Sequence, residues 1–423
     1  MLELQRIREN KDYVIERLAV KNFDAAPLVE KIVELDQDRR AKQKELDDLL
    51  AQSNQLAKEI GQYFKSGEKE KAEATKKETV VLKEKSKSLS EELDRIVAEL
   101  DAALIELPNL PHASVASGKG EDDNEIVFSE GEIPTLGADA IPHWELAEKY
   151  QIIDFNLGSK VTGAGFPFYR GKGARLQRAL INFFLDEALQ AGYLEYQPPL
   201  LINEASGYGT GQIPDKEGQM YYVGVDKLYL IPTAEVPITN IYRNVMLKEE
   251  DFPIKNVAYS NCFRREAGSY GKDVRGLNRL HQFDKVEIVQ IQHPDKSYDT
   301  LEEMKAHVAG LLRKLELPFR ILRLCGGDIS FTSALTFDFE VYSAAQKRWL
   351  EVSSVSNFES YQSNRMKLRY KDKDSKTHLA HTLNGSALAL PRVVAALLEN
   401  NQTEKGILIP KALQSYTGFE YID

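Results

Sequence analysis

The chain has 423 residues, of which 42% are hydrophobic and 28% charged, and its formal net charge is −10. This is the balance of an ordinary globular protein, and the length allows two or three domains. The acidic total argues against a protein coated in nucleic acid, although a local basic surface is compatible with it.

Composition also limits location and cofactors. No apolar run reaches the ~20 residues of a membrane helix. The N-terminal stretch MLELQRIREN is charged and amphipathic, unlike a secretory signal. Cys262 and Cys325 provide neither a disulfide framework nor a zinc-binding set. We therefore expect a cytoplasmic protein with reduced cysteines, no zinc and no membrane partner.

The N-terminal region carries a heptad pattern. Apolar side chains recur in steps of four and three over residues 28–63 and again over 82–107, with a break at Ser66–Glu68. Two such stripes joined by a glycine-containing turn predict an antiparallel coiled-coil hairpin over about residues 27–107. Each helix would be ~55 Å long at 1.5 Å per residue.

An arm this thin cannot enclose a pocket, so it would serve as a lever, a dimerisation rod or a probe for a large partner. Near its predicted tip lysines outnumber acidic residues, and they are Lys58, Lys65, Lys69, Lys71, Lys76, Lys77, Lys83, Lys85 and Lys87. Two interpretations remain open: charges that keep a coiled coil soluble, or contacts to the phosphates of a long nucleic acid.

Three regions follow from these patterns. The helical arm occupies residues 1–107, a linker rich in Pro, Gly, Ser and acids occupies 108–135, and a mixed α and β domain occupies 136–423. In the last region we expect helices at 172–191, 295–315 and 386–400, and strands at 193–196, 257–259, 283–288, 319–323, 335–342 and 348–357. Because strands recur in runs without a strand–helix–strand rhythm, the fold class predicted is an antiparallel α+β domain behind an all-α arm.

Residues 257–290 read as two strands joined by a glycine-rich loop, and they concentrate positive charge. The cations are Arg264, Arg265, Lys272, Arg275, Arg279 and Lys285. Such a hairpin suits a polyanion such as a nucleoside triphosphate, because arginine offers paired donors to phosphate oxygens. The alternative is a solvated hairpin held by surface salt bridges.

Candidate site residues stand inside otherwise apolar strands. The sequence has no hydrolase motif and no histidine spacing typical of a metal site. It does place polar groups at Thr233, Glu235, Arg264, Glu266, Glu287, Glu351, Ser353 and Ser354. Together these residues offer carboxylates for an ammonium group and a metal ion, and arginine for phosphates and a carboxylate.

Several stretches resemble a known family. FRREAGSYGKDVRGLNRLHQFDKVE resembles the second motif of class II aminoacyl-tRNA synthetases, and HTLNGSALALPRVVAALLENNQ resembles the third. GKGARLQRALINFFLDEALQAGYLEYQPP resembles the first, which lies at the dimer interface in that class. PTAEVPITN and EVSSVSNFESYQSNR resemble segments particular to seryl enzymes, and the arm resembles their tRNA-binding coiled coil. Over essentially its whole length the chain looks like a bacterial-type seryl-tRNA synthetase.

The resemblance implies a homodimeric, ATP- and Mg²⁺-dependent ligase. It would activate serine as seryl-adenylate and transfer it to the 3′ end of tRNA(Ser), and it leaves open whether tRNA(Sec) is also charged. Catalytic roles fall to Arg264, Glu287 and Arg392. The implied contacts to ATP come from Arg264, Arg265, Glu266, Arg279, Phe283, Glu351, Val352, Ser353, Ser354 and Arg392.

The resemblance also implies a serine pocket and a metal site. The pocket would consist of Thr233, Ala234, Glu235, Arg264, Glu287 and Ser386. Glu351 and Ser354 would hold Mg²⁺, which prefers hard oxygen ligands. Ala387 and Pro391 depart from the family pattern, where many members have glycine, and we expect the Ala387 methyl group to lie close to the pocket.

Two rival interpretations stand beside this one. The first is a class II paralogue that adenylates another small amino acid or loads a carrier protein, against which the intact arm argues. The second is a non-catalytic RNA-binding protein on the same scaffold, which would have lost residues such as Arg264 and Glu351. We further expect the loop Gly268–Gly276, with Lys272 and Arg275, to meet the acceptor end of the tRNA.

Overall fold

The computed structural model describes residues 1–137, 140–266 and 275–423. The chain divides into two compact units, one made of Met1–Ala19 with Phe23–Pro108 and the other of Val20–Asn22 with Asn109–Asp423. Among the described residues, no helix combines the length and the apolar character needed to cross a membrane.

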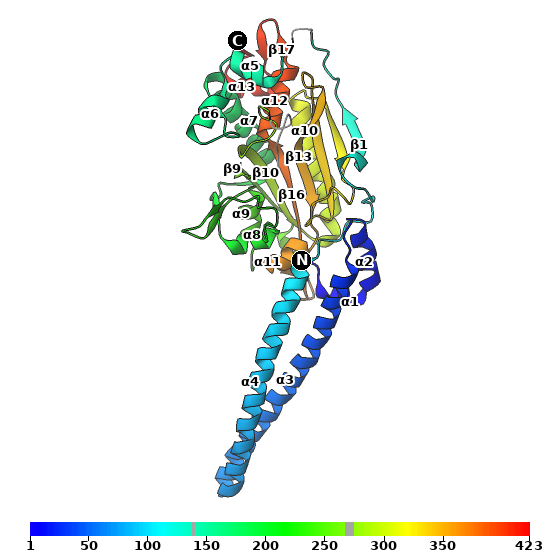
Figure 1. The fold of residues 1–423 in the computed structure, drawn as a ribbon, viewed down its shortest axis with the longest axis vertical. Helices are drawn as coiled ribbons and strands as arrows, with labels where there is room; N and C mark the ends of the chain where they lie inside the picture. Colours follow the sequence, from blue (N-terminus) through cyan, green and yellow to red (C-terminus); the bar gives the residue numbers. More distant parts are fainter. Residues whose placement is uncertain (138–139, 267–274) are drawn as a thin grey trace. The chain divides into compact units, whose positions relative to one another are not determined.

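The first unit is helical throughout (Figure 1). Its helices are α1 (Leu4–Glu9), α2 (Lys11–Ala19), α3 (Ala26–Ser66) and α4 (Lys69–Glu106). Gly67 ends α3 in the left-handed conformation, with φ at 81°, a geometry that glycine adopts without steric cost. The predicted hairpin is therefore present, and the turn lies where the heptad pattern breaks.

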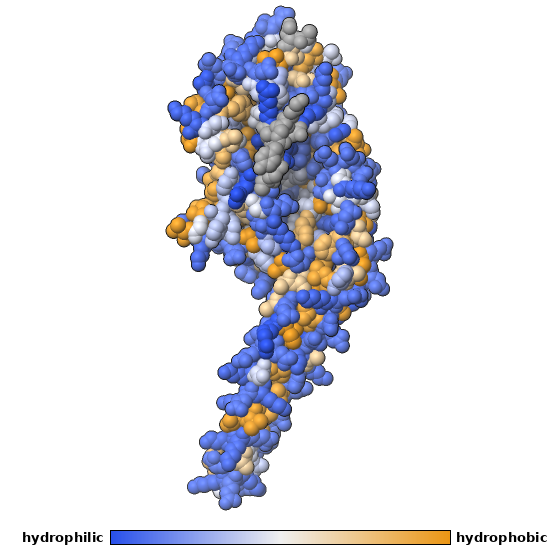
Figure 2. Space-filling view, viewed as in Figure 1, coloured by the Kyte–Doolittle hydropathy of each residue, from blue (hydrophilic) through white to orange (hydrophobic). Residues whose placement is uncertain are grey.

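Periodic leucines hold α3 and α4 together. Leu82, Leu89, Leu93 and Leu100 of α4 are all buried, at the heptad positions expected from the sequence. The remaining surface of the two helices is largely hydrophilic (Figure 2). A narrow apolar stripe with a charged exterior is the pattern of a coiled coil.

The second unit is built on one sheet of eight strands, ordered β1-β11-β12-β13-β16-β10-β9-β4. The strands are β1 (Glu125–Glu130), β4 (Leu194–Tyr196), β9 (Ile254–Phe263), β10 (Gln282–Gln292), β11 (Phe319–Arg323), β12 (Leu335–Ser343), β13 (Arg348–Asn357) and β16 (His381–Ala389). All neighbours pair antiparallel except β4 with β9. The α+β class predicted from the sequence is confirmed.

Three helices pack against this sheet and share its apolar core. They are α7 (Gly171–Gln190), α10 (Ser297–Lys314) and α12 (Leu390–Asn400). Shorter helices are α5 (His143–Lys149), α6 (Phe155–Val161), α8 (Glu204–Thr210), α9 (Glu235–Asn240), α11 (Tyr361–Met366) and α13 (Lys411–Thr417).

Small sheets complete the unit. They join β2 (Ile153–Asp154) with β3 (Phe168–Tyr169), and β5 (Leu201–Ile202) and β6 (Tyr222–Val223) with β7 (Leu228–Leu230). The others join β14 (Arg369–Lys371) with β8 (Met246–Lys248) and β15 (Thr377–Leu379), and β18 (Gly406–Leu408) with β17 (Gln402–Thr403) and β19 (Tyr421–Ile422).

Two predicted boundaries need correction. The stretch 108–135, expected to be a linker, contributes β1, which pairs with β11 along the edge of the large sheet. The last predicted helix begins at Leu390 and not at residue 386, because residues 381–389 form β16 between β10 and β13. Pro391 suits this start, since proline at the first turn of a helix lacks only a donor that would have no partner there.

Candidate active site

The hairpin of β9 and β10 frames the site. Phe263 at the end of β9 faces Gln282 at the start of β10, so Arg264 and Phe283 stand at the mouth of the hairpin. The backbone N–H of Arg264 donates to the carbonyl of His281 at 2.9 Å. Its guanidinium carbon lies 5.3 Å from the centre of the Phe283 ring, within reach of a cation–π contact. The hairpin predicted from the sequence is confirmed.

A buried polar cluster lies next to this hairpin, and we call it the carboxylate pocket: Thr233, Glu235, Lys285, Glu287 and Ser386. Lys285 Nζ lies 2.6 Å from Glu287 Oε2 and donates to Thr233 Oγ1 at 2.8 Å. Ser386 Oγ donates to Glu287 Oε2 at 3.4 Å. Glu287 is only 2% exposed and Glu235 only 8%. Four residues expected from the sequence thus meet in one place.

The carboxylate pocket contains more negative than positive groups. Burial and, to a smaller extent, the negative charge of Glu287 raise the pKa of Glu235 to about 7, although hydrogen bonds and the charge of Lys285 oppose this rise. Gln362 Nε2 donates one of these to Glu235 Oε1 at 2.7 Å. Lys285 supplies a single ammonium group for two carboxylates, so the carboxylate pocket favours one more cation.

Lys285 is a pocket member that sequence reasoning missed. The sequence placed it among the cations of the hairpin, yet its side chain is buried at 5% exposure beside Glu287. The signal available was its position two residues before Glu287 in a strand, because residues i and i+2 of a strand share a face.

A second group of oxygens stands on β12 and β13. Ser354 Oγ donates to Glu351 Oε1 at 3.5 Å, and Asp338 is the cross-strand partner of Ser354. Asp338 Oδ1 is buried without a hydrogen-bond partner among the described residues. Burial raises the pKa of Asp338 well above its ordinary value, and the charge of Glu351 adds to this, although a hydrogen bond from Ser354 opposes it.

These oxygens are hard donors of the kind that a divalent cation prefers. An acceptor oxygen buried without a donor is costly unless something positive satisfies it. No group of three or more His, Cys, Asp and Glu side chains in the described ranges is arranged to hold a metal. Mg²⁺ needs fewer protein ligands, because it keeps waters and phosphate oxygens.

Arg392 closes the same region from the start of α12. Its Nη1 donates to the Glu351 carbonyl at 2.9 Å and lies 3.6 Å from Glu351 Oε2. Its Nε donates to the carbonyl of Asn278 at 2.9 Å. Two backbone acceptors therefore fix the plane of this guanidinium group.

Glu266 and Arg279 flank the loop of residues 267–274, which lies outside the described residues together with Lys272. Arg279 Nε lies 3.3 Å from Glu266 Oε2. Arg275, expected at the tRNA, stacks its guanidinium group 4.7 Å from the ring centre of Trp144.

Other predicted site residues turn their side chains elsewhere. Val352 and Ala387 pack in the core of the large sheet, and Ala234 packs in a small apolar cluster. Ser353 Oγ donates to the carbonyl of Ser386 at 2.6 Å. Arg265 is placed by its backbone N–H, which donates to Gln219. The expectation that the Ala387 methyl group approaches the pocket is corrected, because strand alternation turns it away from Ser386.

Comparison with known proteins places this site in a family. Residues 1–111 match the model of the seryl-tRNA synthetase N-terminal domain, and residues 222–401 match the class II core domain of tRNA synthetases for G, H, P, S and T. A serine–tRNA ligase of Salinibacter ruber is 51% identical over 424 residues, which covers 100% of this chain and 99% of the relative. The chain belongs to the seryl-tRNA synthetase family.

Further relatives agree with this membership. A serine–tRNA ligase of Neisseria meningitidis is 45% identical and covers 99% of the chain and 98% of its own length. The seryl-tRNA synthetase of Pyrococcus horikoshii complexed with ATP superposes with a TM-score of 0.92 at 33% identity, over 99% of both chains. Cytoplasmic serine–tRNA ligase of Naegleria fowleri in complex with AMP gives 0.88 at 26% identity, over 100% of this chain and 99% of that one. The similarity to seryl enzymes therefore extends over essentially the whole chain, with the class II core domain matched over residues 222–401.

Proposed function

We propose that the enzyme joins serine to ATP as seryl-adenylate and transfers the seryl group to the 3′ end of tRNA(Ser). The observation that carries the proposal is the carboxylate pocket, where two buried carboxylates share one lysine. A free amino acid brings the ammonium group that such a pocket lacks. Relatives named serine–tRNA ligase at 44–51% identity support serine as that amino acid.

Serine would lie between the pocket and Arg264. Glu235, with Thr233, would receive the α-ammonium group, and the Arg264 guanidinium would pair with the carboxylate, which matches its fork of donors. Glu287 and Ser386, already in contact, would bind the serine hydroxyl. A site built around that hydroxyl would reject alanine by about 10⁴-fold, because its polar groups would otherwise lose their partner.

ATP would lie along the mouth of the hairpin. The adenine ring would stack on Phe283, and Glu266 would accept a hydrogen bond from its amino group. Arg264 would contact the α-phosphate, Arg279 the γ-phosphate, and Arg392 the phosphates from the side of α12. The pair Glu266–Arg279 would then separate into two substrate contacts. The Pyrococcus relative was solved in complex with ATP, which supports ATP as the nucleotide substrate.

The chemistry needs no protein nucleophile. A serine carboxylate oxygen attacks the α-phosphorus, the bond to the β-phosphate bridging oxygen breaks, and pyrophosphate leaves with the electron pair. Arg264 and Arg392 would stabilise the charge that develops on phosphate oxygens, and alignment supplies the rest. The tRNA 3′ hydroxyl then attacks the seryl carbonyl carbon, and AMP leaves.

Glu351 and Ser354 would hold Mg²⁺, with the unpartnered oxygen of Asp338 behind them. When bound, the ion would neutralise phosphate charge. The fit rests on the hard oxygen donors of these residues.

Partners beyond serine and ATP are part of the same proposal. The helical arm of residues 27–107 would grip the body of tRNA(Ser), and charging of tRNA(Sec) in vitro would test whether it is a second substrate. Two copies would pair through α7, the counterpart of the first class II motif. We also expect the enzyme in the cytoplasm, which cell fractionation would test.

Serine-dependent ATP–pyrophosphate exchange tests the proposal. We expect exchange with serine and at least ~10³-fold less with glycine or alanine, because neither presents a hydroxyl to Glu287. Charging of total tRNA with each labelled amino acid would follow. Exchange with a different amino acid, or none with serine, would refute the proposal and favour a paralogue or a non-catalytic role.

A further inference from the structure

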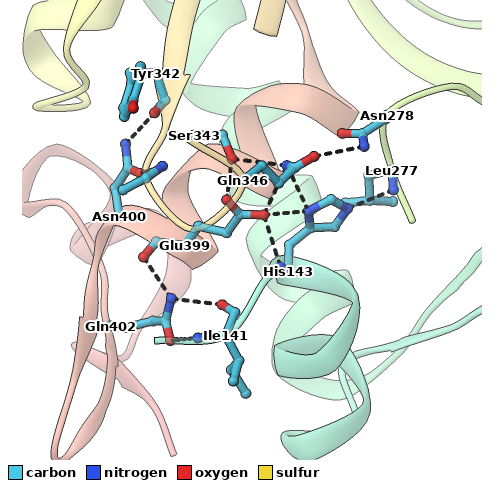
Figure 3. A network of polar contacts seen from close by, with 11 residues as sticks. Ile141, His143, Leu277, Asn278, Tyr342, Ser343, Gln346, Glu399, Asn400 and Gln402 are labelled. Carbon is cyan, nitrogen blue, oxygen red and sulfur yellow. Dashed lines mark hydrogen bonds and ion pairs between the residues drawn. The ribbon is translucent and has the colours of Figure 1, made fainter. Parts of the chain in front are cut away.

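A buried polar network connects α5 and α12 with the residues that follow the loop (Figure 3). We call it the His143 network: His143, Leu277, Asn278, Ser343, Gln346 and Glu399. His143 and Glu399 are both fully buried, at 0% exposure. None of these residues contacts substrate in the function proposed above, so the network has no assigned role.

Glu399, near the end of α12, is the centre of the network. Its Oε1 accepts hydrogen bonds from His143 Nδ1 at 2.7 Å and from Gln346 Nε2 at 3.0 Å, and its Oε2 accepts one from Ser343 Oγ. Burial raises its pKa, but the bonds from His143 and Ser343 outweigh this and leave the pKa below its ordinary value. Glu399 is therefore a charged, fully bonded anchor.

The hydrogen bonds also define the tautomer of His143. The backbone N–H of Leu277 donates to His143 Nε2 at 2.9 Å. Because a backbone N–H can only donate, Nε2 carries no hydrogen, and the ring hydrogen sits on Nδ1 and points to Glu399. The imidazole thus connects a carboxylate on α12 to one backbone amide after the loop.

A second connection runs in parallel. Asn278 Nδ2 donates to Gln346 Oε1 at 2.9 Å, and the carbonyl of Asn278 accepts from Arg392 Nε at 2.9 Å. Helix α12 therefore holds residues 277 and 278 from both of its ends, through Arg392 in its first turn and through Glu399 in its last. Arg279 is the next residue in the chain.

Close packing strengthens this attachment. Gly276 has a φ of 66°, and a Cβ atom built there would lie 2.2 Å from His143 Nε2. Any other residue at this position would clash with the imidazole and displace the chain from it. It would also strain the backbone, because the left-handed conformation favours glycine. Arg275 stacks on Trp144, the neighbour of His143. Consecutive residues after the loop therefore dock on one surface at the start of α5.

We infer that His143 is a positioning residue for adenylate formation: its Nε2, oriented by Glu399, fixes residues 276–278 and so aims Arg279 and Arg392 at ATP. The inference rests on the proposed function, in which these arginines contact the phosphates. Its effect should fall on ATP and not on serine, because Glu235, Lys285 and Glu287 belong to other parts of the site.

Two matched substitutions separate the bonds of His143. In His143→Asn the amide reaches only to the place of Nδ1, so it can bond Glu399 but not Leu277. In His143→Gln the amide extends to the place of Nε2 and can accept from Leu277. We expect His143→Asn to raise the KM for ATP about tenfold or more in serine-dependent exchange and to leave the KM for serine within about twofold. His143→Gln should recover most of the loss.

Gly276→Ala provides an independent variant. Its Cβ would displace the same residues, so the same ATP-selective defect is expected, with cooperative thermal unfolding of the variant as the folding control. ATP binding measured by calorimetry should weaken in parallel with the KM. Equal losses for ATP and serine, wild-type kinetics in His143→Asn, or no recovery in His143→Gln would overturn the inference. Absence of serine-dependent exchange in the unmodified chain would instead overturn the proposed function.

Discussion

Two clusters of buried carboxylates, one in each unit of the molecule, are compensated differently. In the helical unit Asp36 is 1% exposed and lies within 3.2 Å of Arg8, Arg39 and Arg40. In the sheet unit, Glu235 and Glu287 share Lys285. Burial raises the pKa of Asp36, but Arg39 and Arg8 lower it below its ordinary value, whereas that of Glu235 rises to about 7.

This difference separates a structural ion cluster from a binding site. Asp36 has more positive charge around it than it needs, and its ion pairs join α1 to α3. The carboxylate pocket has less than it needs, and the missing charge is what a substrate can supply. An under-compensated buried cluster is therefore a better sign of function than burial or charge alone.

The largest loss of activity should come from deleting most of the helical arm. Deleting residues 38–96 removes most of the arm and should abolish aminoacylation of tRNA(Ser), because the grip on the tRNA is lost. Serine-dependent ATP–pyrophosphate exchange should stay within about threefold, since no residue of the proposed adenylate site is removed. Equal loss of both activities, in a variant whose sheet unit still unfolds cooperatively, would show that the arm also contributes to adenylate formation and not only to tRNA binding.

Removing a carboxylate from the pocket should have the next largest effect. Glu287→Gln keeps the shape but leaves Lys285 with a neutral partner, and we expect kcat/KM for serine in the exchange reaction to fall by about 10³-fold. The matched control is Asp36→Asn, which should leave this value unchanged. A loss below tenfold in Glu287→Gln would place the serine hydroxyl elsewhere.

The pH dependence of serine binding tests the shortage of positive charge directly. Below its pKa of about 7 Glu235 is protonated and cannot pair with an ammonium group, so the KM for serine should fall about tenfold as pH rises from about 6 to about 8. The same raised pKa means that the folded state holds this proton more tightly than the unfolded state, so stability declines as pH rises toward 7. Glu235→Gln should bind serine weakly at every pH; a slope that persists there would point to another group.

The smallest effect belongs to Asp36. Asp36→Asn leaves the three arginines, which are 31–50% exposed, able to turn to water. We expect a loss of only about 1–2 kcal/mol in the unfolding of the helical unit, measured by circular dichroism in urea. Exchange activity should not change. A fall in exchange would contradict the division between a structural and a functional cluster.

Periodic features of this molecule could be predicted from the sequence. The heptads around Leu82 and Leu100 and the apolar runs of β9 and β10 specify local structure, because helix and strand periodicity need only neighbouring residues. Family motifs then pointed to Arg264, Glu287 and Arg392. The boundary at Leu390 was missed because an apolar run does not distinguish a buried strand from a helix.

Contacts between distant segments could not be predicted. Asp338 meets Ser354 only through the register of β12 and β13, and His143 meets Glu399 across 256 residues of chain. No local sequence pattern encodes such tertiary contacts, since they depend on the strand order and register of the whole sheet. Lys285 shows the intermediate case, where the strand was predicted correctly but the buried side of it was not.

Gly67, in the turn between α3 and α4, limits how the length of the helical arm can change among relatives of this enzyme. Gly67 lies at the tip, and buried leucines repeat along α4 from Leu82 to Leu100. An insertion in one helix alone would therefore shift the apolar residues between the insertion and the tip relative to those of the other helix. The reach of the hairpin can change only by matched additions to both helices, in whole heptads of ~10 Å each. Arm length in this family should accordingly vary in steps and not continuously.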